Sequence, residues 1–341
     1  MNQLATNQLV TNQLVTVTGA EGFIGSHLVD TLVRSGKRVR AMVLYNSFNS
    51  WGWLDQLSPD VLAQVEVVLG DVRDPLSVRE CMRDADVVYH LAALIAIPYS
   101  YQAPHSYVQT NVVGTLNVLE AARELYTPRV VHTSTSEVYG TARQIPIQES
   151  HPLQAQSPYA ASKIGADKLA ESYHLSFGVP VVTLRPFNTY GPRQSARAVI
   201  SSVMSQIAAR VPVIKVGSLA PTRDFNYVTD TAEAFLAVGT APADQVVGQT
   251  FNTGTGVEVS VGELVEAISR VMNSRARVEQ ETQRLRPDAS EVMRLISDSS
   301  RLRQATDWSP KYPLLRGLEL TSQWFLDQQN LSKYRTGMYA I

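Results

Sequence analysis

Segments that resemble β-strands alternate with segments that resemble helices from Gln13 to about residue 186, and this alternation restricts the possible folds strongly. The strand-like runs are rich in Val and Leu, and a turn or helix signal follows each of them. Such a pattern predicts an α/β fold with a doubly wound parallel sheet, covered by helices on both faces. The expected strands are Leu14–Thr18, Val39–Leu44, Val65–Leu69, Val87–Leu91, Val130–Ser134 and Val181–Arg185.

Helices are expected between these strands, and the regular alternation ends near Pro186. Beyond that point Gly, Pro and Arg become more frequent, which favours a smaller, mixed C-terminal region that binds substrate. The expected helices are Phe23–Ser35, Pro75–Arg83, Pro104–Tyr126 and Pro158–Phe177.

The first residues contain a short repeat, in which NQLA, TNQLV and TNQLV follow one another from Asn2 to Val15. The repeat has neither a basic start nor a long apolar core, so it is not a secretory signal. We expect residues 1–12 to form a mobile N-terminal extension, to which we assign no function.

The composition of the 341 residues, with 44% apolar and 18% charged residues, predicts a globular protein with a large core. The net charge is −1 and no basic stripe is visible, which argues against a nucleic-acid partner. The longest apolar run, Val87 to Ile97, contains His90 and is too short to cross a membrane.

Cysteine and histidine usage indicates neither disulfides nor a metal site. Cys81 is the only cysteine, and the six histidines have no ligand-like spacing. We interpret His90 and His132, both in expected strands, as hydrogen-bonded core residues. A reducing cytoplasm is the expected location of such a chain.

The first turn, TGAEGFIG, has glycines at positions 19, 22 and 25, between an expected strand and an expected helix. Glycines let the backbone approach a pyrophosphate closely, and the free N–H groups at the start of a helix attract it. The turn therefore predicts dinucleotide binding by Gly19, Gly22, Phe23, Ile24 and Gly25.

An acidic residue that would bind the adenosine ribose is missing from the end of the second strand, where Val43 and Leu44 stand instead. Nearby arginines, at positions 38 and 40, suit a ribose phosphate, whereas Asn46, Ser47 and Asn49 suit plain hydroxyls. The pattern favours NAD modestly and leaves NADP open. Asp71, after the third strand, is placed either to reach the adenine or to cap its own loop.

A tyrosine and a lysine four residues apart follow a helix-start signal, Ser157 and Pro158, so Tyr159 and Lys163 are expected on one helical face. An ammonium about 5 Å from a phenol, at an effective dielectric of about 20, favours the phenolate by about 3 kcal/mol. Tyr159 is therefore expected to accept a hydroxyl proton at neutral pH while a hydride leaves the same carbon.

The order of motifs along the chain resembles the extended short-chain dehydrogenase/reductases that act on nucleotide sugars. The motifs are TGAEGFIG, GDVRD, HLAA, NVVGTLNVLEAA, TSTSEVYG, SPYAASK, RPFNTYGPRQ and RDFNYV. The resemblance implies a Rossmann domain at residues 13–186 with about 228–253, and a nucleotide-sugar domain at 187–227 and 254–341. It also implies cofactor contacts from Asp71, Val72, Leu91, Ala92, Ala93, Tyr159 and Lys163.

Within this resemblance, Thr135, Ser136 and Glu137 bear on the reaction. Plain epimerases of the superfamily usually have no acid at the position of Glu137, whereas in hexose 4,6-dehydratases this glutamate is the base for carbon 5. The implied reaction begins with oxidation of carbon 4 by Tyr159 and NAD. Glu137 then removes the hydrogen of carbon 5, water leaves carbon 6, and the hydride returns to carbon 6.

Ser136 departs from the thymidine-linked glucose dehydratases, which have an aspartic acid there. The Thr-Ser-Glu order resembles GDP-mannose 4,6-dehydratases, and it also resembles nucleotide-uronate decarboxylases. We therefore expect a 4,6-dehydratase, a lyase. The alternatives are a decarboxylase or 4-epimerase, or a non-catalytic dinucleotide-binding regulator.

The nucleotide diphosphate is expected to contact Asn188, Arg193 and Arg223, and also Arg286 in RLRPD, on the basis of the resemblance and of the suitability of arginine for phosphates. YNSFNSWGWLD and PRQSARAVI are similar to a branch that acts on nucleotide-linked N-acetylglucosamine. The superfamily also implies a homodimer through the helices Pro104–Tyr126 and Pro158–Phe177.

Overall fold

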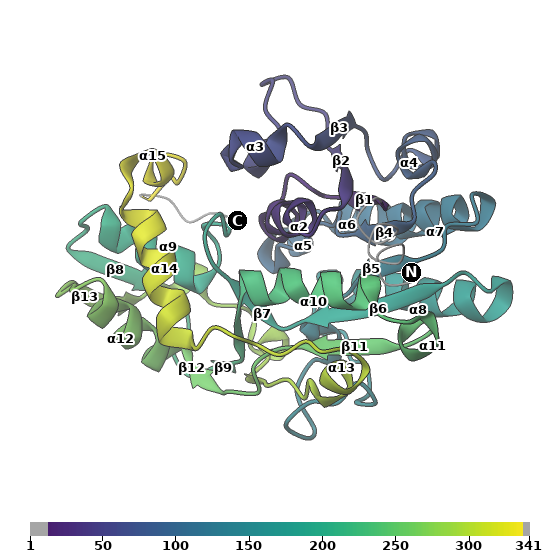
Figure 1. Ribbon diagram of the computed structural model, residues 1–341. Helices are drawn as coiled ribbons and strands as arrows, with labels where there is room; N and C mark the ends of the chain where they lie inside the picture. The colour runs from purple at the N-terminus through teal and green to yellow at the C-terminus, as the bar shows by residue number, and fades with distance from the viewer. Residues whose placement is uncertain (1–12, 337–341) are drawn as a thin grey trace.

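A seven-stranded parallel sheet forms the centre of the computed structural model, which describes residues 13–336 (Figure 1). The strand order is β11-β6-β5-β4-β1-β2-β3, and the polypeptide therefore runs outward from β1 in both directions. This is the predicted doubly wound arrangement. The strands are β1 (Leu14–Thr18), β2 (Arg38–Val43), β3 (Val65–Leu69), β4 (Val87–His90), β5 (Val130–Thr133), β6 (Val181–Pro186) and β11 (Thr250–Thr253).

The six predicted strands all form, with ends that shift by at most one residue. β11 was not predicted as a strand, although residues 228–253 were assigned to the same domain. It pairs with β6 in parallel through Thr250 and Thr183. Its sequence, TFNT, is too short and too polar to give a clear strand signal, so its pairing with β6 decides its structure.

Helices cover both faces of the sheet, and the sheet separates two apolar clusters. One cluster joins Leu28 and Val29 of α2 to Phe235 of α10. The other joins Val78 of α4, Val118 of α7 and Ala170 of α8. The helices involved are α2 (Phe23–Arg34), α4 (Pro75–Met82), α7 (Gly114–Glu124), α8 (Pro158–Phe177) and α10 (Val228–Thr240).

The helix expected at Pro104–Tyr126 is interrupted, which corrects that prediction. It consists of α6 (Pro104–Tyr107), a wider π-helical segment (Val108–Val113) and α7. Asn111 in the π segment uses its side chain outside the helix, because its amide bonds to the backbone N–H and C=O of Leu94 at 2.8 and 2.9 Å. Such π segments often occur at functional sites.

The C-terminal elements pack around a third apolar cluster beside the sheet, at the left of Figure 1. The cluster includes Met204 of α9 (Val199–Ala208), Leu264 of α12 (Val261–Val271) and Phe325 of α14 (Leu314–Leu326). The boundaries predicted between the two domains stay a prediction.

The C-terminal elements also include three short sheets. They pair β7 (Asn188–Tyr190) with β10 (Phe225–Tyr227), β8 (Val213–Val216) with β13 (Arg277–Gln280), and β9 (Thr222–Arg223) with β12 (Val259–Ser260) and β14 (Arg294–Leu295).

The remaining elements are short. They are η1 (Gly52–Gln56), α3 (Pro59–Leu62), α5 (Ile97–Gln102), η3 (Ser136–Tyr139), α11 (Ala243–Val246), η4 (Thr282–Arg284), η5 (Asp288–Ser290), α13 (Ser300–Ala305) and α15 (Gln328–Leu331). Within residues 13–336, none of the helices combines the length and the apolar character that a membrane span requires. The expected extension at residues 1–12 lies outside the described residues.

The close packing of α10 on β4 gives a testable prediction about stability. A Cβ atom at Gly239 would lie 1.9 Å from the hydroxyl oxygen of Tyr89, whose side chain is fully buried. Because the surroundings must shift, we expect Gly239→Ala to lower the free energy of unfolding by about 1–3 kcal/mol in urea titrations. In the control Gly262→Ala, the nearest atom lies 3.6 Å away, so no loss is expected. Equal stability of both variants would contradict this packing.

Candidate active site

A cavity of about 1100 Å³ lies at the carboxyl ends of the sheet strands and extends to the C-terminal elements. This edge is where ligands bind in open α/β sheets. The cavity brings together all but one of the predicted site residues. They are Gly19, Gly22, Phe23, Ile24, Gly25, Asp71, Val72, Leu91, Ala92, Ala93, Thr135, Ser136, Glu137, Tyr159, Lys163, Asn188, Arg223 and Arg286.

The glycine turn fits a dinucleotide because it leaves no room for side chains. A Cβ atom at Gly19 would lie 2.7 Å from the backbone N of Ala92, and one at Gly25 would lie 2.1 Å from the carbonyl O of Gly19. α2 begins directly after Gly22, and no side chain caps its N-terminus. Its first N–H groups therefore face the cavity region without an intrahelical partner, as a pyrophosphate requires.

The basic residues near β2 do not reach the cavity, so the structure gives no support to a ribose-phosphate site at Arg38 or Arg40. The Arg40 guanidinium lies 3.0 Å from Glu66 and donates to the carbonyl oxygens of Cys81 and Arg83. Asn46 bonds within its own loop, to Ser50 and Phe48. NAD therefore fits this edge better than NADP does.

Asp71 both lines the cavity and organises its own loop. Its carboxylate accepts hydrogen bonds from the backbone N–H and the guanidinium of Arg73. The hydrogen bond with the Arg73 side chain lowers the pKa of Asp71, although burial opposes this effect. Both interpretations made for Asp71 from the sequence are therefore compatible with its position.

Tyr159 and Lys163 lie on one face of α8, which begins as the sequence predicts. The Ser157 hydroxyl caps the helix by accepting the Ala160 N–H at 3.1 Å, and Pro158 occupies the first turn. Lys163 Nζ donates to the carbonyl O of Thr133 at 2.6 Å, at the end of β5. The lysine is thereby held at the sheet edge beside Tyr159, and both side chains are buried.

The expected lowering of the Tyr159 pKa by Lys163 is wrong for the chain by itself. Burial raises the pKa of Tyr159 above its ordinary value, and a side-chain hydrogen bond with Thr135 only partly opposes this. Burial also lowers the pKa of Lys163 to about 8, against the charge of Asp167. Desolvation is the largest effect on the pKa of both groups, because both side chains have left water.

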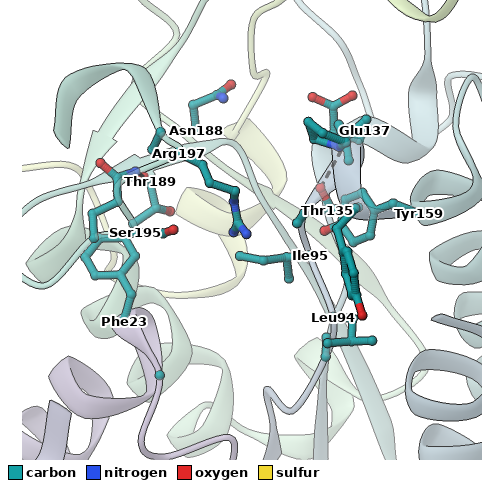
Figure 2. Close-up of a pocket in the computed structure, with 18 of the residues that line it drawn as sticks. Phe23, Leu94, Ile95, Thr135, Glu137, Tyr159, Asn188, Thr189, Ser195 and Arg197 are labelled. Atoms are coloured by element: carbon teal, nitrogen blue, oxygen red, sulfur yellow. Dashed lines mark hydrogen bonds between the residues drawn. The ribbon is translucent and has the colours of Figure 1, made fainter. Parts of the chain in front are cut away.

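Thr135, Ser136 and Glu137 follow β5 directly. The Thr135 hydroxyl caps η3 by accepting the Glu137 N–H at 3.2 Å. Figure 2 shows Glu137 above Thr135 and Tyr159 on one side of the cavity, with Asn188, Thr189 and Ser195 on the other side. The carboxylate and the phenol thus face the same space.

A cluster of charges surrounds Glu137. Arg286 Nη1 lies 3.8 Å from Oε1 of both Glu137 and Glu291, and Arg223 Nη2 lies 3.2 Å from Oε1 of Glu291. The Glu137 side chain is only 13% exposed, so these charges interact with little screening by water. The two arginines offer cations for phosphate oxygens next to the candidate base.

Arg193 is the predicted residue that does not line the cavity. Its backbone has a φ of 70°, and its guanidinium donates to His27 Nδ1 at 3.2 Å. Arg197 occupies the cavity instead, and Figure 2 shows its side chain extending toward Ile95. The sequence segment PRQSARAVI contains both residues, and nothing in it distinguishes the two arginines.

Asn111 is a second residue that the sequence analysis missed. Its amide also donates to the Ser162 hydroxyl at 2.9 Å, so it joins α8 to the loop after β4, which lines the cavity.

The prediction that His90 and His132 are hydrogen-bonded core residues is confirmed. His90 bonds Thr18 and Thr115, and His132 bonds Asp167. Among residues 13–336 there is no group of three or more metal-binding side chains.

Asp167 joins α8 to strands β5 and β6 of the sheet. Its carboxylate accepts hydrogen bonds from His132 at 3.0 Å, from Ser134 at 2.8 Å and from Arg185 at 2.9 Å. Burial would raise the pKa of Asp167, but the bond from His132 and the charge of Arg185 outweigh it and lower the pKa to about 2.

This buried ion pair predicts a pH-dependent stability. Asp167→Asn leaves the Arg185 guanidinium buried without a countercharge, so we expect it to lower the free energy of unfolding by about 3–5 kcal/mol. The Asp167 pKa is lower in the folded state than the ordinary unfolded value of about 3.9. The stabilisation is therefore complete above about pH 4 and disappears toward about pH 2.

Urea titrations from pH 8 downward measure this difference. Asp30→Asn is the matched control, because its partner Arg34 is 58% exposed, and little change in the free energy of unfolding is expected there. If Asp167→Asn were as stable as the wild-type protein at pH 7, the structural role of the pair would be refuted.

Comparison with known proteins agrees with this geometry. The sequence profile of the family described as GDP-mannose 4,6 dehydratase matches residues 16–321. A dTDP-glucose 4,6-dehydratase of Xanthomonas campestris is 31% identical over 338 residues, covering 92% of this chain and 93% of that protein. A UDP-glucose 4-epimerase of Mycolicibacterium smegmatis is 34% identical over 322 residues, covering 91% and 97%. A UDP-glucuronic acid decarboxylase of Arabidopsis thaliana is 34% identical over 89% of this chain and 67% of that protein.

A solved structure supports the same conclusion about the fold and the cofactor. The dTDP-glucose 4,6-dehydratase of Streptomyces venezuelae, with NAD bound, superposes with a TM-score of 0.81 at 26% identity, covering 95% of this chain and 99% of that one. With its seven-stranded sheet, glycine turn and Tyr159–Lys163 pair, this chain belongs to the extended short-chain dehydrogenase/reductases that act on nucleotide sugars, a family of NAD-dependent enzymes.

Proposed function

We propose that the protein is a nucleotide-hexose 4,6-dehydratase, which converts its substrate to a nucleotide-linked 4-keto-6-deoxyhexose. One observation supports this above the others. The Glu137 carboxylate shares the cavity with Tyr159 and Thr135, so a base and an oxidation site face one ligand. The family profile, named for a 4,6 dehydratase, is consistent with the proposal.

The first half of the reaction is oxidation of carbon 4. The glycine turn, Tyr159 and Lys163 would hold NAD, which would supply the hydride acceptor for carbon 4 and the hydride donor for carbon 6. Tyr159 accepts the proton of the 4-hydroxyl, and Thr135 stabilises the phenolate through its hydrogen bond. Because burial raises the Tyr159 pKa, the phenolate needs nearby positive charge, to which Lys163 and the bound nicotinamide both contribute.

The second half is elimination of water. The ketone at carbon 4 acidifies the hydrogen at carbon 5, and Glu137 takes it as a proton. The electron pair left behind forms a double bond to carbon 6 and expels the 6-hydroxyl, which leaves as water after Glu137 protonates it. Hydride addition at carbon 6 and a proton taken up from solvent at carbon 5 complete the product, and Tyr159 releases the 4-hydroxyl proton to solvent. Glu137 serves as base and acid because Ser136 is too weak an acid.

Polar and cationic side chains that line the cavity suit the diphosphate of the substrate. Asn188, Arg223 and Arg286 line the cavity, and Arg197 replaces Arg193 in the proposed site.

We further propose N-acetylglucosamine as the sugar, because of the segments YNSFNSWGWLD and PRQSARAVI. We also propose a homodimer that forms through α7 and α8. Leu175 and Phe177 near the end of α8 are 75% and 52% exposed, which is consistent with a covered surface there.

The competing reactions are uronate decarboxylation and 4-epimerisation, because relatives with these names are equally similar to the chain. A panel of UDP-, GDP- and dTDP-linked hexoses and UDP-glucuronate, assayed by mass spectrometry, separates the three. We expect loss of one water from a hexose. Release of carbon dioxide from the uronate, or only an isomer of equal mass, would refute the dehydratase proposal.

Glu137→Gln tests the assigned base. The amide cannot accept the carbon 5 proton, so we expect dehydration to slow by about 100-fold or more. Oxidation at carbon 4 is expected to persist, which borodeuteride trapping of the 4-keto sugar detects. In deuterium oxide, the wild-type product acquires deuterium at carbon 5.

Glu291→Gln is the control, because it removes a carboxylate from the same charge cluster and leaves the base intact. We expect this variant to alter KM more than the rate of dehydration. If Glu137→Gln dehydrated as fast as the wild-type enzyme, Glu137 would not be the base.

A further inference from the structure

A carboxylate stands at the end of β2 although the sequence has no acid there. In NAD-binding sheets of this type, an acid directly after the second strand binds the adenosine ribose. Here Leu44 follows β2, and its backbone N–H donates to Glu21 Oε1 at 3.1 Å. Glu21 belongs to the glycine turn after β1, so the carboxylate comes from a different segment and reaches the same place.

The segment after β2 holds Glu21 in this position. The Trp53 N–H donates to the carbonyl O of Glu21 at 3.0 Å. Gly52 has a φ of 61°, and a Cβ atom there would lie 2.9 Å from the same carbonyl O and 3.0 Å from Glu21 Cβ. Both the backbone and the side chain of Glu21 are therefore fixed against residues 44–53.

The Glu21 carboxylate retains an unused capacity to accept a hydrogen bond. Its Oε2 atom is buried and has no hydrogen-bond partner among residues 13–336. Such an oxygen costs free energy unless a donor meets it. Glu21 lines the same cavity as Gly19 and Asp71. The nucleotide half of a dinucleotide would occupy this part of the cavity, and the hydroxyls of its ribose are hydrogen-bond donors.

The cations around this position do not favour a ribose phosphate. Arg40 is committed to Glu66 and to two carbonyl oxygens, away from the cavity. Arg73 does line the cavity, but its guanidinium pairs with Asp71. A phosphate on the ribose would therefore lie near the Glu21 carboxylate, while Arg40 and Arg73 are already paired with other groups. Repulsion between the two negative charges would disfavour this phosphate.

We propose that Glu21 is a cofactor-specificity residue, which binds the adenosine ribose hydroxyls in place of the missing acid after β2 and thereby selects NAD over NADP. The assignment depends only on the dinucleotide site. It holds whether the enzyme dehydrates, decarboxylates or epimerises its sugar, so the failure of the proposed reaction would leave it intact.

The test measures which dinucleotide the full-length protein retains. Purified protein is equilibrated with equal concentrations of NAD and NADP, freed of unbound nucleotide by gel filtration, and its bound nucleotides are quantified by chromatography. We expect the wild-type protein to retain NAD over NADP by about tenfold or more, as a hydrogen bond to a charged group implies.

Glu21→Gln keeps an oxygen for the Leu44 N–H and removes the charge, so a purely structural role predicts no change in the bound ratio. We expect the NAD to NADP ratio to fall at least fivefold. Glu66→Gln, which removes a carboxylate paired with Arg40 outside the cavity, is the control and should match the wild-type protein. Glu21→Ser provides the same test if the Gln variant is unstable. An unchanged ratio in a folded Glu21 variant, or wild-type preference for NADP, would overturn the proposal.

Discussion

The buried carboxylate of Asp167 is the contact on which the site geometry depends. It accepts hydrogen bonds from His132 and Ser134 on the β5 side and from Arg185 of β6, and Arg185 in turn donates to the Tyr139 hydroxyl at 2.9 Å. Tyr159, Lys163 and Asp167 are spaced four residues apart on α8 and therefore lie on one face of the helix. The hydrogen bonds of Asp167 hold this face, two turns after the phenol, against the sheet. A helix held in this way fixes the phenol relative to η3, which carries Glu137.

The cavity combines two requirements that oppose each other. Hydride and proton transfer need groups that are dry and fixed, and desolvation of those groups moves their pKa values away from neutrality. Tyr159 and Lys163 show this effect, since burial raises the pKa of the phenol and lowers that of the amine to about 8. In the proposed reaction, the bound nicotinamide would add positive charge to that of Lys163, so we expect formation of the phenolate to depend on cofactor binding.

Much of the fold follows from local sequence patterns, because apolar runs and glycine turns act through their nearest neighbours. The strands and α8 with its Ser157 cap were predictable in this way, as were the glycine turn and the Tyr159–Lys163 pair. Most of the eighteen site residues around the cavity were expected from the family resemblance instead. The π segment at Asn111, the strand β11 and the choice of Arg197 over Arg193 depend on contacts with distant segments. Glu21 is a similar case, since its carboxylate is brought to β2 by folding and not by its place in the sequence.

In the proposed reaction, Tyr159 and Glu137 act on one sugar ring. A crystal structure of the enzyme with NAD and its nucleotide sugar would show whether they do. We expect Tyr159 Oη to lie within hydrogen-bond distance, about 2.6–3.2 Å, of the oxygen on carbon 4, with the Glu137 carboxylate directed at the hydrogen of carbon 5. A bound sugar whose carbon 5 faces away from Glu137, while this carboxylate stays paired with Arg286, would contradict it.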